Sequence, residues 1–103
     1  MALTQFAFCQ VGVGYGSSNI PVPIASSVTS EHKAPSASNQ ATTASAPTGI
    51  AEVMCRVATD TAVYVKFGTT PDATVTGARF FIPANGIEYF RVNPGDKAAV
   101  VNA

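Results

Sequence analysis

The fold is decided by residues 50–67, which read IAEVMCRVATDTAVYVKF. Apolar side chains alternate with polar ones along residues 50–58, a pattern typical of a strand with one buried face. A second alternating run follows at residues 61–67, and Thr59-Asp60 is a plausible tight link between the two runs. The positions expected on the apolar faces are Ala51, Val53, Cys55 and Val57 in the first run and Val63, Val65 and Phe67 in the second.

After residue 67 the sequence predicts further short strands separated by turn residues. Residues 78–82 and 87–92 are predicted strands, and the Asn85-Gly86 pair between them is the strongest hairpin signal in the chain. Asn93-Pro94-Gly95-Asp96 predicts a further turn, because Pro and Gly supply the backbone angles that turns require. Residues 97–102 then form a closing strand.

One more strand is predicted near the start of the chain, where residues 3–13 alternate with Phe6 and Phe8 on one face. No window has a convincing helical period. Six strands with closely spaced turns predict an all-β fold, either a small β-sandwich or a jelly-roll-like barrel. The first strand can pair within its own domain or with a neighbouring subunit, and the sequence leaves both open.

A long extended arm is predicted between the first strand and the other five. Residues 34–49 carry no charge, no aromatic ring and no large aliphatic side chain, so they cannot build a core of their own. Such a segment is expected to be ordered only when another protein chain holds it. The sequence therefore divides into an N-terminal strand and glycine hinge (1–16), an Ala/Ser/Thr/Pro-rich arm (17–49) whose extended reach is about 100 Å, and a β-domain (50–103).

Charge and length narrow the classes of function. The 103 residues support one domain, and six Lys and Arg balance six Asp and Glu, which argues against nucleic acid or an anionic membrane as a partner. Charged residues make up only 12% of the chain, so its surface either faces other proteins or is covered by Ser, Thr, Asn and Gln. The N-terminus does not resemble a secretory signal, and no apolar run is long enough to span a bilayer.

No constellation in the sequence predicts an enzyme, a cofactor or a metal site. His32 is the only histidine, and it has no second ligand type or nucleophile nearby in sequence. The glycines between residues 12 and 17 lack the spacing of a phosphate loop and are interpreted as hinges. Glu52 and Glu88 could form a carboxylate pair, but cross-strand ion pairing or a subunit contact fits their neighbours better.

The two cysteines are expected to behave as small buried hydrophobic residues. Cys9 and Cys55 lie in apolar alternating runs and lack metal-type spacing. A disulfide between them is possible if the two strands are neighbours.

Aromatic and basic side chains gather around the Asn85-Gly86 turn. One face of the predicted hairpin is expected to be core, and the other is either core, through a second sheet, or a protein interface, where such residues are favoured. With zero net charge, a nucleic-acid site is the weakest of the three interpretations. The residues predicted to contact a partner, here or elsewhere along the chain, are Phe6, Phe8, Ile20, Val22, Ile24, His32, Arg79, Phe81, Tyr89 and Arg91.

Three runs in the second half of the chain resemble small virion proteins of tailed bacteriophages. They are residues 56–68 (RVATDTAVYVKFG), 81–92 (FIPANGIEYFRV) and 94–101 (PGDKAAVV). The resemblance is to head decoration or cement proteins, which clamp capsid subunits from outside, or to small tail and neck components. It implies a homo-oligomer on the capsid surface of a virion, made in the host cytoplasm, with the major capsid protein and neighbouring copies as partners and with no catalytic residues.

A second hypothesis is a carbohydrate-binding β-domain, for instance at the tip of a fibre. Tyr64, Tyr89 or Asn85 at an exposed edge would then contact the sugar.

Overall fold

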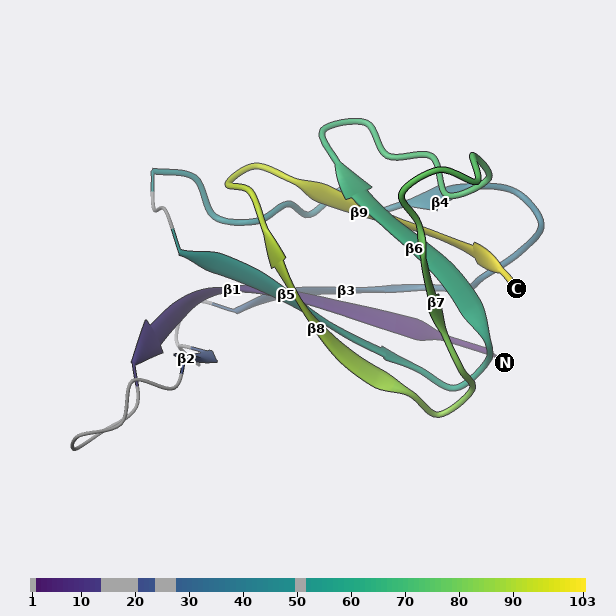
Figure 1. Cartoon of the computed structure of the whole chain (residues 1–103), viewed down its shortest axis with the longest axis horizontal. Coiled ribbons are helices and arrows are strands. Elements are labelled where there is room, and N and C mark those ends of the chain that lie inside the picture. Colours follow the sequence, from purple (N-terminus) through teal and green to yellow (C-terminus); the bar gives the residue numbers. More distant parts are fainter. Residues whose placement is uncertain (1, 14–20, 24–27, 50–51) are drawn as a thin grey trace.

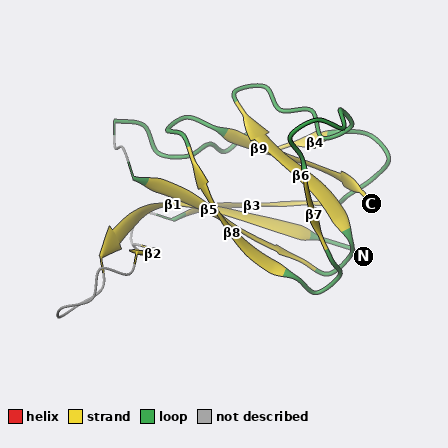
Figure 2. Cartoon of the chain, in the orientation of Figure 1, coloured by secondary structure: helices red, strands yellow, loops and turns green. Residues whose placement is uncertain are grey.

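A computed structural model describes residues 2–13, 21–23, 28–49 and 52–103. These residues form strands and loops without a helix, as Figures 1 and 2 show, so the all-β prediction is confirmed. Within them no helix is long and apolar enough to cross a membrane. The strands are β1 (Thr4–Val13), β2 (Pro21–Pro23), β3 (Thr29–Lys33), β4 (Gln40–Ala41), β5 (Val53–Thr59), β6 (Val63–Gly68), β7 (Phe80–Ile82), β8 (Ile87–Val92) and β9 (Lys97–Asn102).

The strands form two antiparallel sheets. The first sheet has the order β2-β1-β5-β8, and β3 also pairs with β1. The second sheet has the order β4-β9-β6-β7. All six strands expected from the sequence are present, and the first of them pairs with β5 of the same chain, which settles the alternative that the sequence left open.

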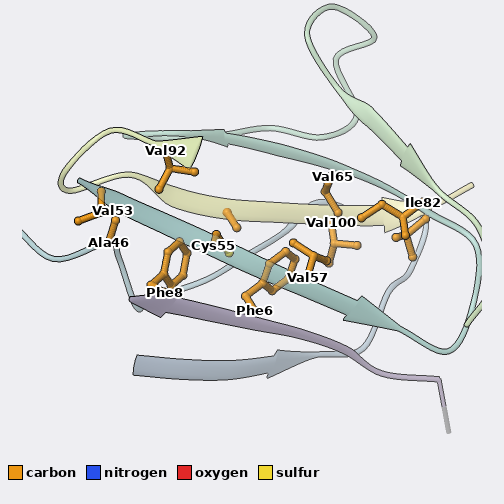
Figure 3. Packing of buried hydrophobic residues seen from close by; sticks show 12 residues of the cluster. Phe6, Phe8, Ala46, Val53, Cys55, Val57, Val65, Ile82, Val92 and Val100 are labelled. Atoms are coloured by element: carbon orange, nitrogen blue, oxygen red, sulfur yellow. The ribbon is translucent and has the colours of Figure 1, made fainter. Parts of the chain in front are cut away.

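The core lies between the two sheets, where the apolar faces of their strands meet (Figure 3). The first sheet contributes Phe6 and Phe8, both fully buried, opposite Val57 and Cys55 on the neighbouring strand. The second sheet contributes valines of β6 and β9 and Ile82 of β7. The alternation seen in the sequence therefore does set the buried faces: in β5 every second residue from Val53 to Thr59 is buried.

The predicted hairpin around Asn85-Gly86 is wrong. β7 pairs with β6 in the second sheet, whereas β8 pairs with β5 in the first, so the turn carries the chain from one layer to the other. The turn itself is present: Gly86 N–H donates to Pro83 O at 3.0 Å, and Asn85 has a φ of 61°. As a result, Ile82 enters the core from the second sheet and Val92 enters it from the first.

The predicted extended arm is also wrong for the residues that are described between 28 and 49. β3 pairs with β1, β4 pairs with β9, and the chain after β4 continues along β9. Thr42 N–H donates to Ala98 O and Ala46 N–H donates to Asp96 O, each at 2.8 Å. Thr42 and Ala46 are consequently buried, although the tract has no large apolar side chain.

The backbone explains why this tract is ordered without a foreign surface. β9 would otherwise be an edge strand with unpaired amides and carbonyls, and the tract satisfies those groups by hydrogen bonding. The radius of gyration is 13.5 Å, close to the roughly 13 Å expected of a compact domain of about 100 residues.

Candidate protein-interaction surface

The cysteines offer no reactive thiol. Cys9 lies opposite Met54 in the β1–β5 pairing, and Cys55 lies opposite Phe8, so the two sulfurs face opposite sides of one sheet. Both are free and buried, and no disulfide joins them even though their strands are neighbours. Burial raises the pKa of the Cys9 thiol and raises that of Cys55 to about 12, which keeps both protonated and poorly nucleophilic at neutral pH.

The two glutamates considered as a catalytic pair lie on different faces. Glu88 lies opposite Val57 and therefore points toward the side of the first sheet that carries the core. Glu52 instead forms an ion pair with Arg91, with 2.6 Å between Oε2 and Nη2, and both side chains are more than half exposed. Cross-strand ion pairing of Glu52 is thus confirmed. In the described part of the chain no group of three or more His, Cys, Asp or Glu residues could hold a metal ion.

The most conspicuous surface feature is a set of large apolar side chains on β7 and β8, here called the aromatic edge. Phe80 and Phe81 are 50% and 55% exposed, and Ile87 and Tyr89 are 51% and 57% exposed. β7 and β8 are the last strands of the two sheets and lie on the same side of the molecule (Figure 1), so the four side chains border one edge of the sandwich. Phe80 shares the core-facing side of Val65, Phe81 lies on the outer face of the second sheet, and Ile87 and Tyr89 lie on the outer face of the first. Clusters of exposed apolar side chains on a small protein commonly mark interaction sites.

Two rings of the aromatic edge, those of Phe80 and Phe81, each pack against a neighbouring ring. Phe90 lies between Phe67 and Phe80, with centroid distances of 5.0 and 4.9 Å. Tyr64 packs edge-on against Phe81 at 5.6 Å. Such contacts fix the rings while their outer faces stay open, which lowers the entropy lost when a partner docks.

Arg79 completes the support of this surface. Its guanidinium carbon lies 3.8 Å from the centroid of the Tyr64 ring, and its Nη1 donates to Ala73 O at 3.1 Å. Arg79 thus joins the loop between β6 and β7 to the second sheet. Arginine and aromatic side chains in this combination are typical of the energetic centre of protein interfaces.

A partner is expected to bind the aromatic edge through side chains rather than by adding a strand. β7 is only three residues long, which leaves little backbone for pairing. In β8, the exposed Glu88 shares the face of Val57, and a charge on the core side of an edge strand is a common device against edge-to-edge pairing.

A small cleft opens next to Tyr89 on the outer face of the first sheet. Its volume is about 160 Å³, and the Glu52–Arg91 ion pair lies at its wall. The lining is mostly apolar, so the cleft can accept one apolar side chain of a partner. The lining residues are Val11, Glu52, Met54, Tyr89, Phe90 and Arg91.

The structure separates the residues that the sequence predicted to contact a partner. Phe6 and Phe8 are fully buried in the core, so their predicted place at an interface is wrong. The alternating pattern of β1 could not distinguish the face that meets the second sheet from a face that meets another chain. Arg79, Phe81, Tyr89 and Arg91 lie at the aromatic edge or the adjacent cleft.

The remaining predicted contact residues lie elsewhere. His32 is exposed on β3, which lies at the edge of the first sheet opposite to β8. Ile20 and Ile24 are outside the described residues, and Val22 lies in β2, where its side chain is not described.

Sequence reasoning missed Phe80 and Ile87 as surface residues. Both alternate with polar or aromatic neighbours as core residues do, and Phe80 shares the face of the buried Val65. Phe80 is exposed because β7 ends its sheet, and Ile87 is exposed because it lies opposite Ala58 on the outer face of the first sheet. No local pattern encodes either property.

No protein-family model, curated protein or solved structure matches this chain.

Proposed function

We propose that this chain is a structural subunit that binds other protein surfaces through its aromatic edge. The observation that carries the proposal is the exposure, each by half or more, of Phe80, Phe81, Ile87 and Tyr89 on the two strands that end the sheets. Leaving four such side chains in water forfeits on the order of 1 kcal/mol each, which a partner would recover by covering them. The low charged fraction of 12% agrees with a chain whose surface is largely covered in an assembly.

The proposed assembly is the virion of a tailed bacteriophage. Residues 56–68, 81–92 and 94–101 support it by their resemblance to small virion proteins, and the partners would be the major capsid protein and neighbouring copies on the capsid surface. The extended arm no longer supports a cementing role, because residues 28–49 bind their own domain. A position in the tail, neck or fibre is the alternative within the same class of function.

The strand order supports a jelly-roll architecture for this role. When the chain is read from β3 to β9 and then β1, the orders β3-β1-β5-β8 and β4-β9-β6-β7 are those of an eight-stranded jelly roll. Jelly rolls occur in viral capsid and lectin domains.

Sedimentation of the purified chain tests the aromatic edge. We expect concentration-dependent association of the wild-type chain and a monomer for the double variant Phe80→Ser/Phe81→Ser, with the circular dichroism spectrum unchanged. Val75→Ser is the matched control, since Val75 is 52% exposed but lies on the loop between β6 and β7. A wild-type chain that stays monomeric at high concentration, or a double variant that associates normally, would refute the role of the edge.

Immunogold labelling tests the virion. Antibodies raised against the chain should label particles purified from cells that produce it, and the position of the gold should distinguish head from tail. Particles that carry none of the chain would refute the virion assignment while leaving the sedimentation result intact.

A further inference from the structure

We infer that the outer face of the first sheet carries a binding groove for a neutral oligosaccharide, separate from the aromatic edge except for the shared Ile87. The groove is shallow, with a volume of about 400 Å³, which is within the range of small-molecule sites. It is lined by Leu3, Gln5, His32, Ala58, Thr59, Asp60, Asn85, Gly86 and Ile87.

The strand register explains how these residues come together. His32 lies opposite Gln5, Gln5 lies opposite Ala58, and Ala58 lies opposite Ile87, so the four form one row across β3, β1, β5 and β8. Residues that are directly opposite in antiparallel strands share a face. Three strand spacings make the row about 14 Å long, enough for more than one sugar ring.

Small residues keep the centre of the row open. Ala58 lies at the middle of the groove and Gly86 at its rim, so a flat ring can approach the backbone between the longer side chains. Ile87 and Leu3, which are 51% and 39% exposed, offer apolar walls for the C–H faces of a sugar.

The polar groups that line the groove are largely free to bind a ligand. Among the described residues, the side chains of His32 and Asn85 make no hydrogen bond, and Gln5 makes one, accepting from Arg56 Nη1 at 3.5 Å. Asp60 uses only Oδ1, which accepts from Leu3 N–H at 2.9 Å. Amide and imidazole groups present donors and acceptors together, as a ligand rich in hydroxyl groups requires.

The charge of the lining selects a neutral ligand. No lysine or arginine is among the lining residues, and the Arg56 guanidinium beside the groove already contacts Gln5 Oε1, so phosphate, sulfate and carboxylate groups would find few cationic partners. Asp60 would repel an anionic sugar. A metal ion is also disfavoured, because metal sites recruit more ligating side chains than this groove offers.

Asn85 is held in place by the turn that presents it. Its φ of 61° is in the left-handed region, which Asn tolerates well. Gly86 O accepts from Thr59 N–H at 3.1 Å, which ties the turn to the end of β5. The amide of Asn85 therefore sits on a rigid support at the rim of the groove.

The test is a titration of the ¹⁵N-labelled chain with neutral di- and trisaccharides: lactose, cellobiose, mannobiose, chitobiose and maltotriose. Sialyllactose and phosphorylated mannose serve as charged probes. At least one neutral sugar should shift the resonances of Gln5, Ala58 and Asn85 with a dissociation constant of about 10 mM or tighter. No shift from any neutral sugar, or shifts from the charged sugars alone, would overturn the inference.

Variants at Asn85 separate ligand binding from turn geometry. Asn85→Gly keeps the left-handed backbone and removes the amide, so we expect an unchanged melting temperature and affinity weaker by about tenfold or more. Gln5→Ala should weaken binding similarly from another strand. Phe81→Ser should bind the sugar as the wild type does, even where it abolishes self-association. Wild-type affinity in both Asn85→Gly and Gln5→Ala would overturn the inference without touching the aromatic edge.

Discussion

The Glu31 carboxylate fastens β3 of the first sheet to the tract that runs along the second. Its Oε1 accepts from Ala44 N–H at 2.9 Å and from the backbone and hydroxyl of Thr43, and its Oε2 lies 3.0 Å from Lys33 Nζ. Burial by itself opposes ionisation of Glu31. The hydrogen bonds from Ala44, Lys33 and Thr43 outweigh burial and lower the pKa of Glu31 from 4.5 to about 2.

The lowered pKa of Glu31 predicts a pH-dependent stability. The contribution is present above pH 4.5, where the carboxylate is ionised in both states, and is lost as the pH falls toward 2. We expect Glu31→Gln to lower the free energy of unfolding by about 1–3 kcal/mol at pH 7 and by much less near pH 2. Urea denaturation at both pH values measures this. An equal loss at the two pH values would contradict the assigned role.

Gly86 is required for steric reasons at the crossing turn. A Cβ at this position would lie 2.8 Å from Pro83 O and 2.9 Å from Ile82 Cγ2, and both neighbours are held by the turn or the core. Gly86→Ala should therefore cost about 1–3 kcal/mol in chemical denaturation. Gly77→Ala is the control, because a Cβ there meets nothing within 4 Å; equal effects of the two substitutions would rule out this explanation.

At the scale of elements, the tract after β4 acts as an irregular edge strand along β9. Thr42 provides a side-chain link as well as a backbone one: its Oγ1 donates to Ala44 O at 2.8 Å and accepts from Ala98 N–H at 3.1 Å. Hydrogen bonds at Ser36 and Ala46 extend the contact to both ends of β9. The tract is thereby part of the domain and not an appendage to it.

Thr42→Val tests this attachment with little change in side-chain volume. Removal of the hydroxyl leaves the buried Ala98 N–H without its acceptor, so we expect a loss of about 1–3 kcal/mol and faster hydrogen exchange at Ala46 and Ala98. Thr76→Val is the control, since that exposed hydroxyl has no hydrogen bond in the described part of the chain. Unprotected amides along the tract in the wild-type monomer would show that it needs a partner after all.

At the scale of the whole molecule, both chain ends are held by the short link between β5 and β6. Asp60 N–H donates to Leu3 O at 3.3 Å, and Ala103 N–H donates to Ala62 O at 3.2 Å. The two ends therefore lie close to each other. β1 comes first in the sequence but pairs with β3 and β5, so the same two sheets should form if the chain began at another loop.

A circular permutant tests that view. Joining Ala103 to Leu3 with about five Gly and Ser residues, and opening the exposed loop between Thr76 and Gly77, should give a folded protein that melts within about 10 °C of the parent. Opening the chain inside β6, between Val65 and Lys66, should prevent folding. Failure of the loop permutant alone would mean that the ends are not free to be joined.

The strands themselves could be predicted because alternation is a local property. β8 and β9 have the boundaries expected from the sequence, and the residues that share each face of β1 and β5 were grouped correctly because the pleat imposes a period of two. The candidate site was predictable only in part. Phe81 and Tyr89, expected at an interface from their type, are both more than half exposed, whereas Phe8 was misassigned because its type and spacing suit a core and an interface equally well.

By itself, the sequence determined the all-β class, six of the strands and the turns between them, since propensity and pleat are encoded within a few neighbouring residues. Only the tertiary structure decided which sheet each strand joins, that Asn85-Gly86 crosses between layers, and that the polar tract lies along β9. These outcomes depend on backbone hydrogen bonds between residues tens of positions apart. Every residue type except proline carries the same backbone amide and carbonyl, so the side-chain pattern does not reveal where those bonds will form.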